Sequence, residues 1–327
     1  MIKSRTIIIA LIFFVIVLIS LLYNGKSNRE LLQKTFFSMD TIVTIETKNQ
    51  VDMDNIQSKI EELNNIFDRH SNGTDLNNLN VNRFVKSSTI KDLIVETSKL
   101  NDIYGYDLNI TSGNLVDAWN ISENPTIPIN DEILKALKSI SMDNIVLQGD
   151  NVKLLNDTTL DVGSVAKGYT LDIVQSMLQN TDATNTYVSM GSSTLMYQVE
   201  NFPIYVRSPN STEDVVCKFF ANDTLYISTS GGYERYIEID GIKYPHILDL
   251  NTGYPIVTDL TSVTICADSG IKSDFLSTYV FMGGTENLSK YLNDDTISLI
   301  AIDNKNNIYV SNNLDVQVLD KSFKVVK

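Results

Sequence analysis

Cysteine and basic residues are scarce in this sequence of 327 residues, and each shortage argues against a class of protein. The two cysteines, Cys217 and Cys266, are too few for a disulfide scaffold and lack the spacing of a metal site. We expect each to be a small buried apolar residue, with a bridge between them as the alternative. Acidic residues outnumber Lys and Arg by 40 to 26, which gives a net charge of −14. This balance argues against nucleic acid as a partner, because phosphate binding requires a basic surface.

Internal repeats and low-complexity linkers are also missing. The composition is 43% hydrophobic and 20% charged, as in globular rather than disordered proteins. A chain of this length can bury a sizeable core. We expect one mixed domain of α+β class over residues 36–327, with antiparallel-rich sheets and flanking helices.

The one long hydrophobic run lies near the amino terminus, where Thr6–Tyr23 carries no charge and follows Lys3 and Arg5. Its length is at the short end of the roughly 20 residues that span a bilayer. Neither a small-residue cleavage site nor a lipoprotein cysteine follows the run. We therefore expect residues 1–23 to be an uncleaved signal anchor in the cell membrane. Residues 24–35 would be a tether to an extracytoplasmic domain.

Hydrophobic periodicity predicts the order of elements along that domain. Alternating apolar and polar residues indicate a strand over 36–47, and helical spacing indicates amphipathic helices over 52–67 and 88–103. Short alternating segments predominate from residue 143 to 268. The other predicted elements are a loop with a short helical turn ending near 82, helices from 130 and over 165–179, 270–282 and 285–292, and a hairpin pairing 298–302 with 307–310.

Four short segments combine residue types that can carry chemistry. The first, Thr159–Tyr169, reads as a short strand, a glycine turn and the start of a helix. Free backbone N–H groups and the positive end of a helix would then converge on one point, which suits a phosphate. Lys167 adds a mobile positive charge. The segment is not a Walker A loop, since Tyr169 stands where that motif requires lysine, and a purely structural turn is the alternative.

The second segment, Ser228–Tyr236, contains hydroxyl side chains followed by paired glycines. Such a sequence permits close approach of the backbone to a ligand. A tight turn between two strands is the alternative explanation.

The third segment, Tyr244–Pro255, contains His246, one of two histidines in the chain. A neutral imidazole can accept a proton from a hydroxyl near neutral pH. A core histidine bonded to the backbone is the alternative. Ser230, His246 and Asp249 could also form a hydrolase triad, but the sequence has no Gly-X-Ser-X-Gly elbow to support one.

The fourth segment, Ser273–Thr278, places Asp274 and Thr278 one helical turn apart. A carboxylate and a hydroxyl are hard oxygen ligands suited to Mg²⁺. Alternatively, the aspartate complements the helix dipole and the threonine bonds back to its own helix. If the carboxylate is a surface ligand, Asp274→Ala should abolish activity with little loss of folding.

In this order, the four segments resemble the motifs of the ApbE family, the FAD:protein FMN transferases. The fullest match is Asp-X-Gly-X-X-Ala-Lys-Gly-Tyr at 161–169, and the resemblance covers about residues 36–310. The other matching motifs lie at 37–41, 74–80, 115–119, 229–236, 246–255 and 273–278, the last ahead of Met282-Gly283.

The resemblance implies an ApbE-like, T-fold-like enzyme that transfers FMN from FAD to a threonine hydroxyl of an acceptor flavoprotein, with release of AMP. The acceptor could be the FMN-binding domain of a membrane redox complex. Mg²⁺ would be held by Asp274, Thr278 and the backbone carbonyl of Ser164. His246 and Lys167 would be catalytic, the histidine helping to activate the threonine beside the pyrophosphate. The residues that the resemblance places against FAD are Met39, His70, Ala118, Trp119, Asn120, Asp161, Lys167 and His246.

The sequence departs from the family pattern at several positions. Asp40 replaces the usual glycine and adds a negative charge near the expected entry of FAD. Met190-Gly191-Ser192 stands where a Gly-Gly pair is common, and Ser112-Gly113 replaces a Gly-Pro. His70 stands where the family generally has an aromatic ring. Two alternatives to transfer therefore stay open: an Mg²⁺-dependent FAD pyrophosphatase that gives FMN and AMP, and a non-catalytic extracellular flavin-binding protein.

Overall fold

The computed structural model describes residues 32–326 with short gaps, which are 49–50, 106–107, 121–125, 180, 182, 192, 199–200, 212, 222–223, 233–235 and 240–241. The predicted signal anchor at 1–23 and most of the predicted tether lie outside the described residues. The tether prediction was wrong at its end, because residues 32–35 already belong to strand β1 (Leu32–Ser38). Within the described part, no helix has the length and apolar character needed to cross a membrane.

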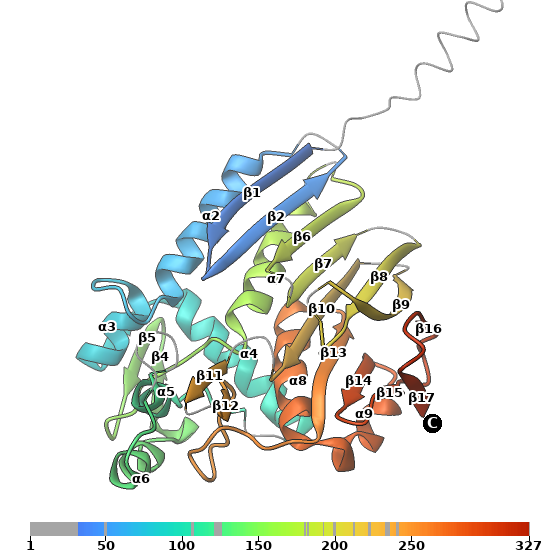
Figure 1. The fold of residues 1–327 in the computed structure, drawn as a ribbon. Coiled ribbons are helices and arrows are strands. Elements are labelled where there is room, and N and C mark those ends of the chain that lie inside the picture. The colour runs from blue at the N-terminus through green and yellow to red at the C-terminus, as the bar shows by residue number, and fades with distance from the viewer. Residues whose placement is uncertain are drawn as a thin grey trace, which may run out of the picture.

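A nine-stranded sheet runs through the molecule (Figure 1). Its order is β1-β2-β6-β7-β10-β13-β14-β15-β17, and all neighbours are antiparallel except β15 and β17. Segments from both ends of the described chain therefore share one sheet, as expected for a single α+β domain. After β1 the strands are β2 (Thr41–Thr47), β6 (Thr186–Met190), β7 (Thr194–Gln198), β10 (Thr224–Gly231), β13 (Leu260–Ala267), β14 (Ser298–Asp303), β15 (Asn307–Val310) and β17 (Lys324–Val326).

Helices α2 (Met53–Phe67), α7 (Ala166–Leu178) and α8 (Gly270–Gly283) cover one face of this sheet (Figure 1). Their apolar stripes bury against strand residues of that face; for example, Ile60 and Val174 share a core cluster with Val43. The predictions of helices at 52–67, 165–179 and 270–282 are thus confirmed.

The other face is partly covered by a small sheet of strands β8 (Phe202–Arg207), β9 (Val215–Ala221) and β16 (Gln317–Val318). Cys217 and Cys266 lie in the core between the two sheets. Both thiols are free, so the expectation of buried apolar residues is confirmed and the alternative of a bridge is not. Burial raises the pKa of both thiols to about 12.

A group of smaller elements lies at one end of the large sheet (Figure 1). Two short sheets, β3-β5-β4 and β11-β12, belong to it. Its members are α3 (Asp75–Asn82), β3 (Phe84–Lys86), α4 (Ser88–Tyr104), α5 (Gly113–Trp119), α6 (Asn130–Lys138), η1 (Met142–Asn144), β4 (Ile145–Gln148), β5 (Asn151–Leu154), β11 (Tyr236–Ile239) and β12 (Ile242–Pro245). The helix predicted at 88–103 is confirmed, whereas α3 replaces the loop expected up to residue 82.

Two more predictions need correction. The single strand expected over 36–47 is a hairpin of β1 and β2, turned by Met39 and Asp40, whose φ angles are 51° and 56°. Positive φ at both central residues is the mark of a type I′ turn, which alternation of apolar residues does not reveal. The segment 285–292 is split into η2 (Thr285–Asn287) and α9 (Ser289–Leu292). The hairpin at 298–310 is confirmed.

Helices α7 and α8 cross with their backbones in contact. A Cβ on Gly168 would lie 2.1 Å from the carbonyl oxygen of Gly270, and a Cβ on Gly270 would lie 2.2 Å from that of Gly168. Only glycine fits at either position. Asp172 of α7 fixes the crossing, because its carboxylate accepts hydrogen bonds from Ser269 Oγ (3.1 Å) and from the N–H groups of Gly270 (2.7 Å) and Ile271 (2.9 Å).

Gly168→Ala should therefore lower the free energy of unfolding by about 3 kcal/mol, since the added methyl overlaps backbone that cannot move aside. Urea unfolding measures the loss. Gly232→Ala is the control, because its added Cβ would make only ordinary contacts at 3.7 Å. Equal losses in the two variants would contradict a backbone-to-backbone crossing.

Asp303 gives a pH-dependent test of the β14–β15 hairpin. Burial alone would raise the pKa of its carboxyl, but bonds from Asn307, from the N–H of Lys305 and from the Tyr309 hydroxyl hold that pKa below its ordinary value. The stabilising contribution of a group with a lowered folded-state pKa is complete above its unfolded pKa of about 4 and is lost as the pH falls through the folded value. We expect Asp303→Asn to be less stable than wild type at pH 7, with the difference shrinking towards pH 3 in urea titrations. A difference that did not change with pH would refute this account.

Candidate functional site

Asp274 is the centre of the candidate site. It lies on α8, its side chain is only 6% exposed, and both carboxylate oxygens accept hydrogen bonds from other elements. Oδ2 accepts from the N–H of Gly168 at 2.8 Å, and Oδ1 accepts from Thr194 Oγ1 of β7 at 2.9 Å. The expectation of a surface ligand was therefore wrong. Truncation to alanine would leave two buried donors unpaired and would cost about 1–3 kcal/mol of stability.

The bond to Asp274 changes the start of helix α7. In a continuous helix the N–H of Gly168 would donate to the carbonyl of Ser164, four residues earlier. Here that N–H is used by Asp274, and α7 begins at Ala166. Among the described residues, no hydrogen bond to the Ser164 carbonyl is found. A carbonyl oxygen without its helical donor thus lies in the turn that Asp274 contacts.

Thr278 follows Asp274 by one turn, as predicted, and its Oγ1 lies 3.2 Å from Ser230 Oγ of β10. Hydroxyl pairs continue along this contact between α8 and β10, with Ser230 and Ser277 joined at 2.9 Å. The second segment is therefore the end of a strand that faces α8, and the tight turn considered as its alternative begins only at Gly232.

The donor types around Asp274 suit Mg²⁺. A carboxylate, a hydroxyl and a free backbone carbonyl are all hard oxygen ligands, and Mg²⁺ needs few protein ligands when substrate phosphates supply the others. Over the part of the chain that the structure describes, no group of three or more His, Cys, Asp or Glu side chains could hold a metal. A divalent cation here would thus depend on a single carboxylate and on the substrate.

Asp161 lies before α7 in a network that the sequence analysis missed. Its Oδ1 accepts from the N–H of Gly163 at 3.0 Å, and its Oδ2 lies 3.6 Å from Arg69 Nη1. Arg69 also makes a two-pronged ion pair with Asp117, at 2.7 and 3.0 Å, and donates to the carbonyl of Gly113 at 3.1 Å. The strand expected at 159–162 is absent from this described segment, where Thr159 makes only an isolated bridge.

Lys167 is half-buried on the first turn of α7, between Ala166 and Gly168. In the described part of the chain it forms no ion pair. No carboxylate of the described residues therefore neutralises its ammonium group, which adds to the positive end of the helix. The prediction that several free N–H groups converge here was wrong, because the N–H groups of Ala166 and Gly168 donate to the Val162 carbonyl at 2.9 Å and to Asp274 at 2.8 Å.

His246 is half-buried directly after β12, and the turn that follows it is built by Asp249. The carboxylate of Asp249 accepts from the N–H of Asn251 at 2.8 Å and from Thr252 Oγ1 at 3.1 Å. The two other side chains of the considered hydrolase triad are engaged elsewhere, because Asp249 bonds within its own turn and Ser230 bonds to α8. A Cβ on Gly232, at the end of β10, would lie 3.7 Å from Pro245, which places His246 near the strand that contacts Thr278.

Trp119 packs directly against the turn that follows His246, to which it donates a hydrogen bond. The side chain is 0% exposed, and its indole N–H donates to the carbonyl of Gly253 at 2.8 Å. The rings of Tyr244 and Tyr254 pack against it at 5.8 and 5.9 Å between centroids. The structure gives Trp119 a packing role, and its predicted contact with FAD stays a prediction. Its neighbours Ala118 and Asn120 are half-buried at the end of α5.

Met39 and His70 lie in two separate loops, the β1–β2 turn and the loop after α2. Met39 is joined to α7 through Thr170, whose hydroxyl lies 3.5 Å from the Met39 sulfur, and to α2 through Asn64 Oδ1, which accepts from the Met39 N–H at 2.9 Å. His70 is exposed after α2, and its N–H donates to Asp68 at 2.8 Å. Asp40 is exposed in the β1–β2 turn.

The structure thus brings Ser164, Lys167, Asp274 and Thr278 together around the α7–α8 crossing and puts Met39 next to it. His246, Trp119 and its neighbours belong to the small elements beyond the end of β10. The residues that sequence reasoning missed are Arg69, Asp172 and Thr194. The sequence could have indicated Asp172, because it is a carboxylate three residues after the 161–169 motif. Nothing in the sequence indicated Thr194.

Comparison with known proteins agrees with these features. The ApbE family model matches residues 39–301. The FAD:protein FMN transferase of Vibrio cholerae is 27% identical over 243 residues, which are 71% of this chain and 73% of that protein. That of Haemophilus influenzae is 24% identical over 274 residues, 78% of this chain and 79% of the relative. The crystal structure of the ApbE protein from Thermotoga maritima has the same fold, with a TM-score of 0.75 and 24% identity over 89% of this chain and 97% of its own. Because the family model spans most of the sequence, this chain belongs to the ApbE family.

Proposed function

We propose that this protein is an FAD:protein FMN transferase, which moves FMN from FAD to a threonine hydroxyl of an acceptor flavoprotein and releases AMP. One observation carries the proposal: the buried carboxylate of Asp274 accepts from the N–H of Gly168, in the helix start whose Ser164 carbonyl accepts no hydrogen bond among the described residues. The names of the curated relatives support the same activity.

The proposed roles follow from the positions of the side chains. Asp274, Thr278 and the Ser164 carbonyl would hold Mg²⁺, which neutralises charge on the pyrophosphate when it is bound. Lys167 and the start of α7 attract the same phosphates. His246 accepts the proton of the incoming threonine hydroxyl. The threonine oxygen bonds to the FMN phosphorus, the bond from that phosphorus to the bridging oxygen breaks, and AMP leaves with that oxygen.

The proposal extends to the location of the enzyme. The apolar run Thr6–Tyr23, preceded by Lys3 and Arg5, supports an anchor in the cell membrane with the catalytic domain outside the cytoplasm. An enzyme at that place would meet acceptor flavoproteins that are membrane-bound or secreted.

Asp274→Asn tests the activity, because asparagine keeps the size of the side chain and removes the charge. We expect flavin transfer to fall at least about 100-fold, since one charged ligand contributes several kcal/mol to such a site. FAD, Mg²⁺ and a purified flavin-acceptor domain are supplied. Covalent flavin is then measured by fluorescence on a denaturing gel, and AMP by chromatography.

The wild-type outcome separates the alternatives. Free FMN without a labelled acceptor would favour the pyrophosphatase, and FAD that stays intact with Mg²⁺ would favour a binding protein. Undiminished AMP release by Asp274→Asn would remove Asp274 from the metal site.

Thr194→Val tests whether the hydroxyl on Asp274 matters for metal binding. Without that donor the carboxylate is oriented less firmly, so we expect the Mg²⁺ concentration for half-maximal activity to rise about 3- to 10-fold, with little change at saturating Mg²⁺. Thr194→Ser should restore the wild-type value. Thr186→Val is the matched control, because Thr186 is equally buried on β6 and its hydroxyl donates to Thr47 at 3.2 Å, opposite Gln198 and four residues along β7 from Thr194. The same shift in the control would assign the effect to general loosening of the core.

A further inference from the structure

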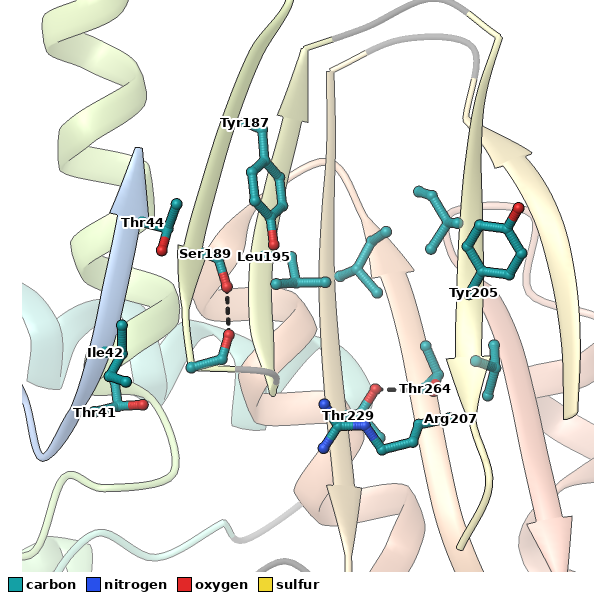
Figure 2. A pocket seen from close by; sticks show the side chains of 14 residues that line it. Thr41, Ile42, Thr44, Tyr187, Ser189, Leu195, Tyr205, Arg207, Thr229 and Thr264 are labelled. Atoms are coloured by element: carbon teal, nitrogen blue, oxygen red, sulfur yellow. Dashed lines mark hydrogen bonds between the residues drawn. The ribbon is translucent and has the colours of Figure 1, made fainter. Parts of the chain in front are cut away.

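A cavity of ≈ 520 Å³ lies on the face of the large sheet that α7 and α8 do not cover (Figure 2). Its walls come from β2, β6, β7 and β10 on one side and from β8 on the other. Because successive strand residues point to opposite faces, Thr229 lines this cavity while its neighbour Ser230 faces Thr278. The site around Asp274 and the cavity are thus separated by the thickness of one sheet.

The cavity follows an open strand edge. Four successive residues of β8, Ile204–Arg207, line the cavity. Alternate side chains of a strand point to opposite faces, so one face of β8 could contribute only every second residue. The cavity therefore lies along the edge of β8. In the described part of the chain, β8 pairs only with β9. Its other edge therefore presents unpaired backbone N–H and C=O groups towards the cavity. Such an edge is the usual template for an added strand from another polypeptide.

Large apolar side chains continue the cavity onto the surface. Phe37 and Ile42 are cross-strand partners on β1 and β2, so both point to the cavity side, and they are 70% and 61% exposed. Tyr205 of β8 is 54% exposed on the other side of the opening. Neighbouring exposed apolar groups of this size are typical of an interaction surface.

The charge of the cavity is opposite to that of the protein. The chain has a net charge of −14, yet the residues that line the cavity include Arg207 and no aspartate or glutamate. Arg207 is exposed and, in the described part of the chain, has no ion-pair partner. A partner segment with a carboxylate near this position would gain an ion pair that the rest of the acidic surface does not offer.

We propose that this cavity is where the acceptor flavoprotein docks, through an extended segment that adds as a strand to the free edge of β8 and places an acidic side chain on Arg207. The cavity extends to the ends of two strands that contact the reaction site. It is lined by Gly191, in the turn before Thr194 of β7, and by Thr229 of β10, one residue before Ser230. A segment held here can pass its threonine round this end of the sheet. The proposal rests on the proposed function and adds its specificity for a protein substrate.

Arg207→Glu tests the ion pair. We expect the KM for the acceptor domain to rise at least about tenfold, as for a charge reversal at a steering contact, while kcat and the KM for FAD stay within about twofold. Arg207→Lys should recover most of the affinity. Lys153→Glu, at an exposed residue of β5, is the matched control for the change in net charge and should behave as wild type. An unchanged KM for the acceptor would overturn the proposal.

Crosslinking tests the site without requiring turnover. With photo-reactive benzoylphenylalanine in place of Tyr205, irradiation should attach the acceptor domain through the peptide that carries its flavin-accepting threonine, as located by mass spectrometry. Attachment to a second copy of this chain, or to a distant acceptor peptide, would overturn the proposal. If the variant crosslinked in this way but wild-type enzyme transferred no flavin, the proposed function would fail and the docking surface would stand.

Discussion

The hydrogen bond from the Gly168 N–H to Asp274 is the interaction on which the rest of the site depends. It can form only because α7 and α8 cross with no side chain between them, at Gly168 and Gly270. The bond orients a buried carboxylate and at the same time removes the helical donor of the Ser164 carbonyl. One contact thus brings together two oxygen donors, from residues far apart in the sequence, that would be available to a cation under the proposed function. Asp172 stabilises the same crossing from the other side, by capping the start of α8.

The large sheet divides the molecule into two functional faces. The alternation of β10 sends Ser228 and Ser230 towards α8, while Thr229 bonds across the other face to Thr264 at 2.9 Å. Small hydroxyl side chains at these positions allow α8 to approach the sheet closely and still satisfy every hydroxyl that makes the contact. The chemistry can therefore be buried on one face, while the part of the opposite face next to β8 stays accessible to a large partner.

The sequence predicted most of the long helices and the chemical character of the four candidate segments. It did not predict which residues of different elements contact one another. Helical periodicity is a local property, so α2, α4, α7 and α8 could be located from their own residues. The type I′ turn at Met39 and Asp40 depends on positive φ angles, which the residue types at these positions do not indicate. The hairpin was therefore predicted as one strand. The spacing of Asp274 and Thr278 correctly predicted a shared helix. The partner of Asp274 on β7, Thr194, could not be predicted, because strand order is set by packing over the whole chain. The same limit applies to Arg69, whose ion pair with Asp117 joins the loop after α2 to helix α5.

The acidic composition and the binding of a dinucleotide are compatible because positive potential is needed only locally. In the described structure the N–H groups of Ala166 and Gly168 already have protein acceptors. The positive charge at the start of α7 therefore comes mainly from Lys167, which no described carboxylate neutralises. Near Asp161 the opposite arrangement holds: Arg69 is shared between Asp117 and Asp161, so its charge is largely consumed within the protein. Attraction for phosphates is therefore concentrated at the first turn of α7, beside the carboxylate that would hold the cation. An acidic surface elsewhere costs little under these conditions, since exposed charges more than about 10 Å away are screened by physiological salt.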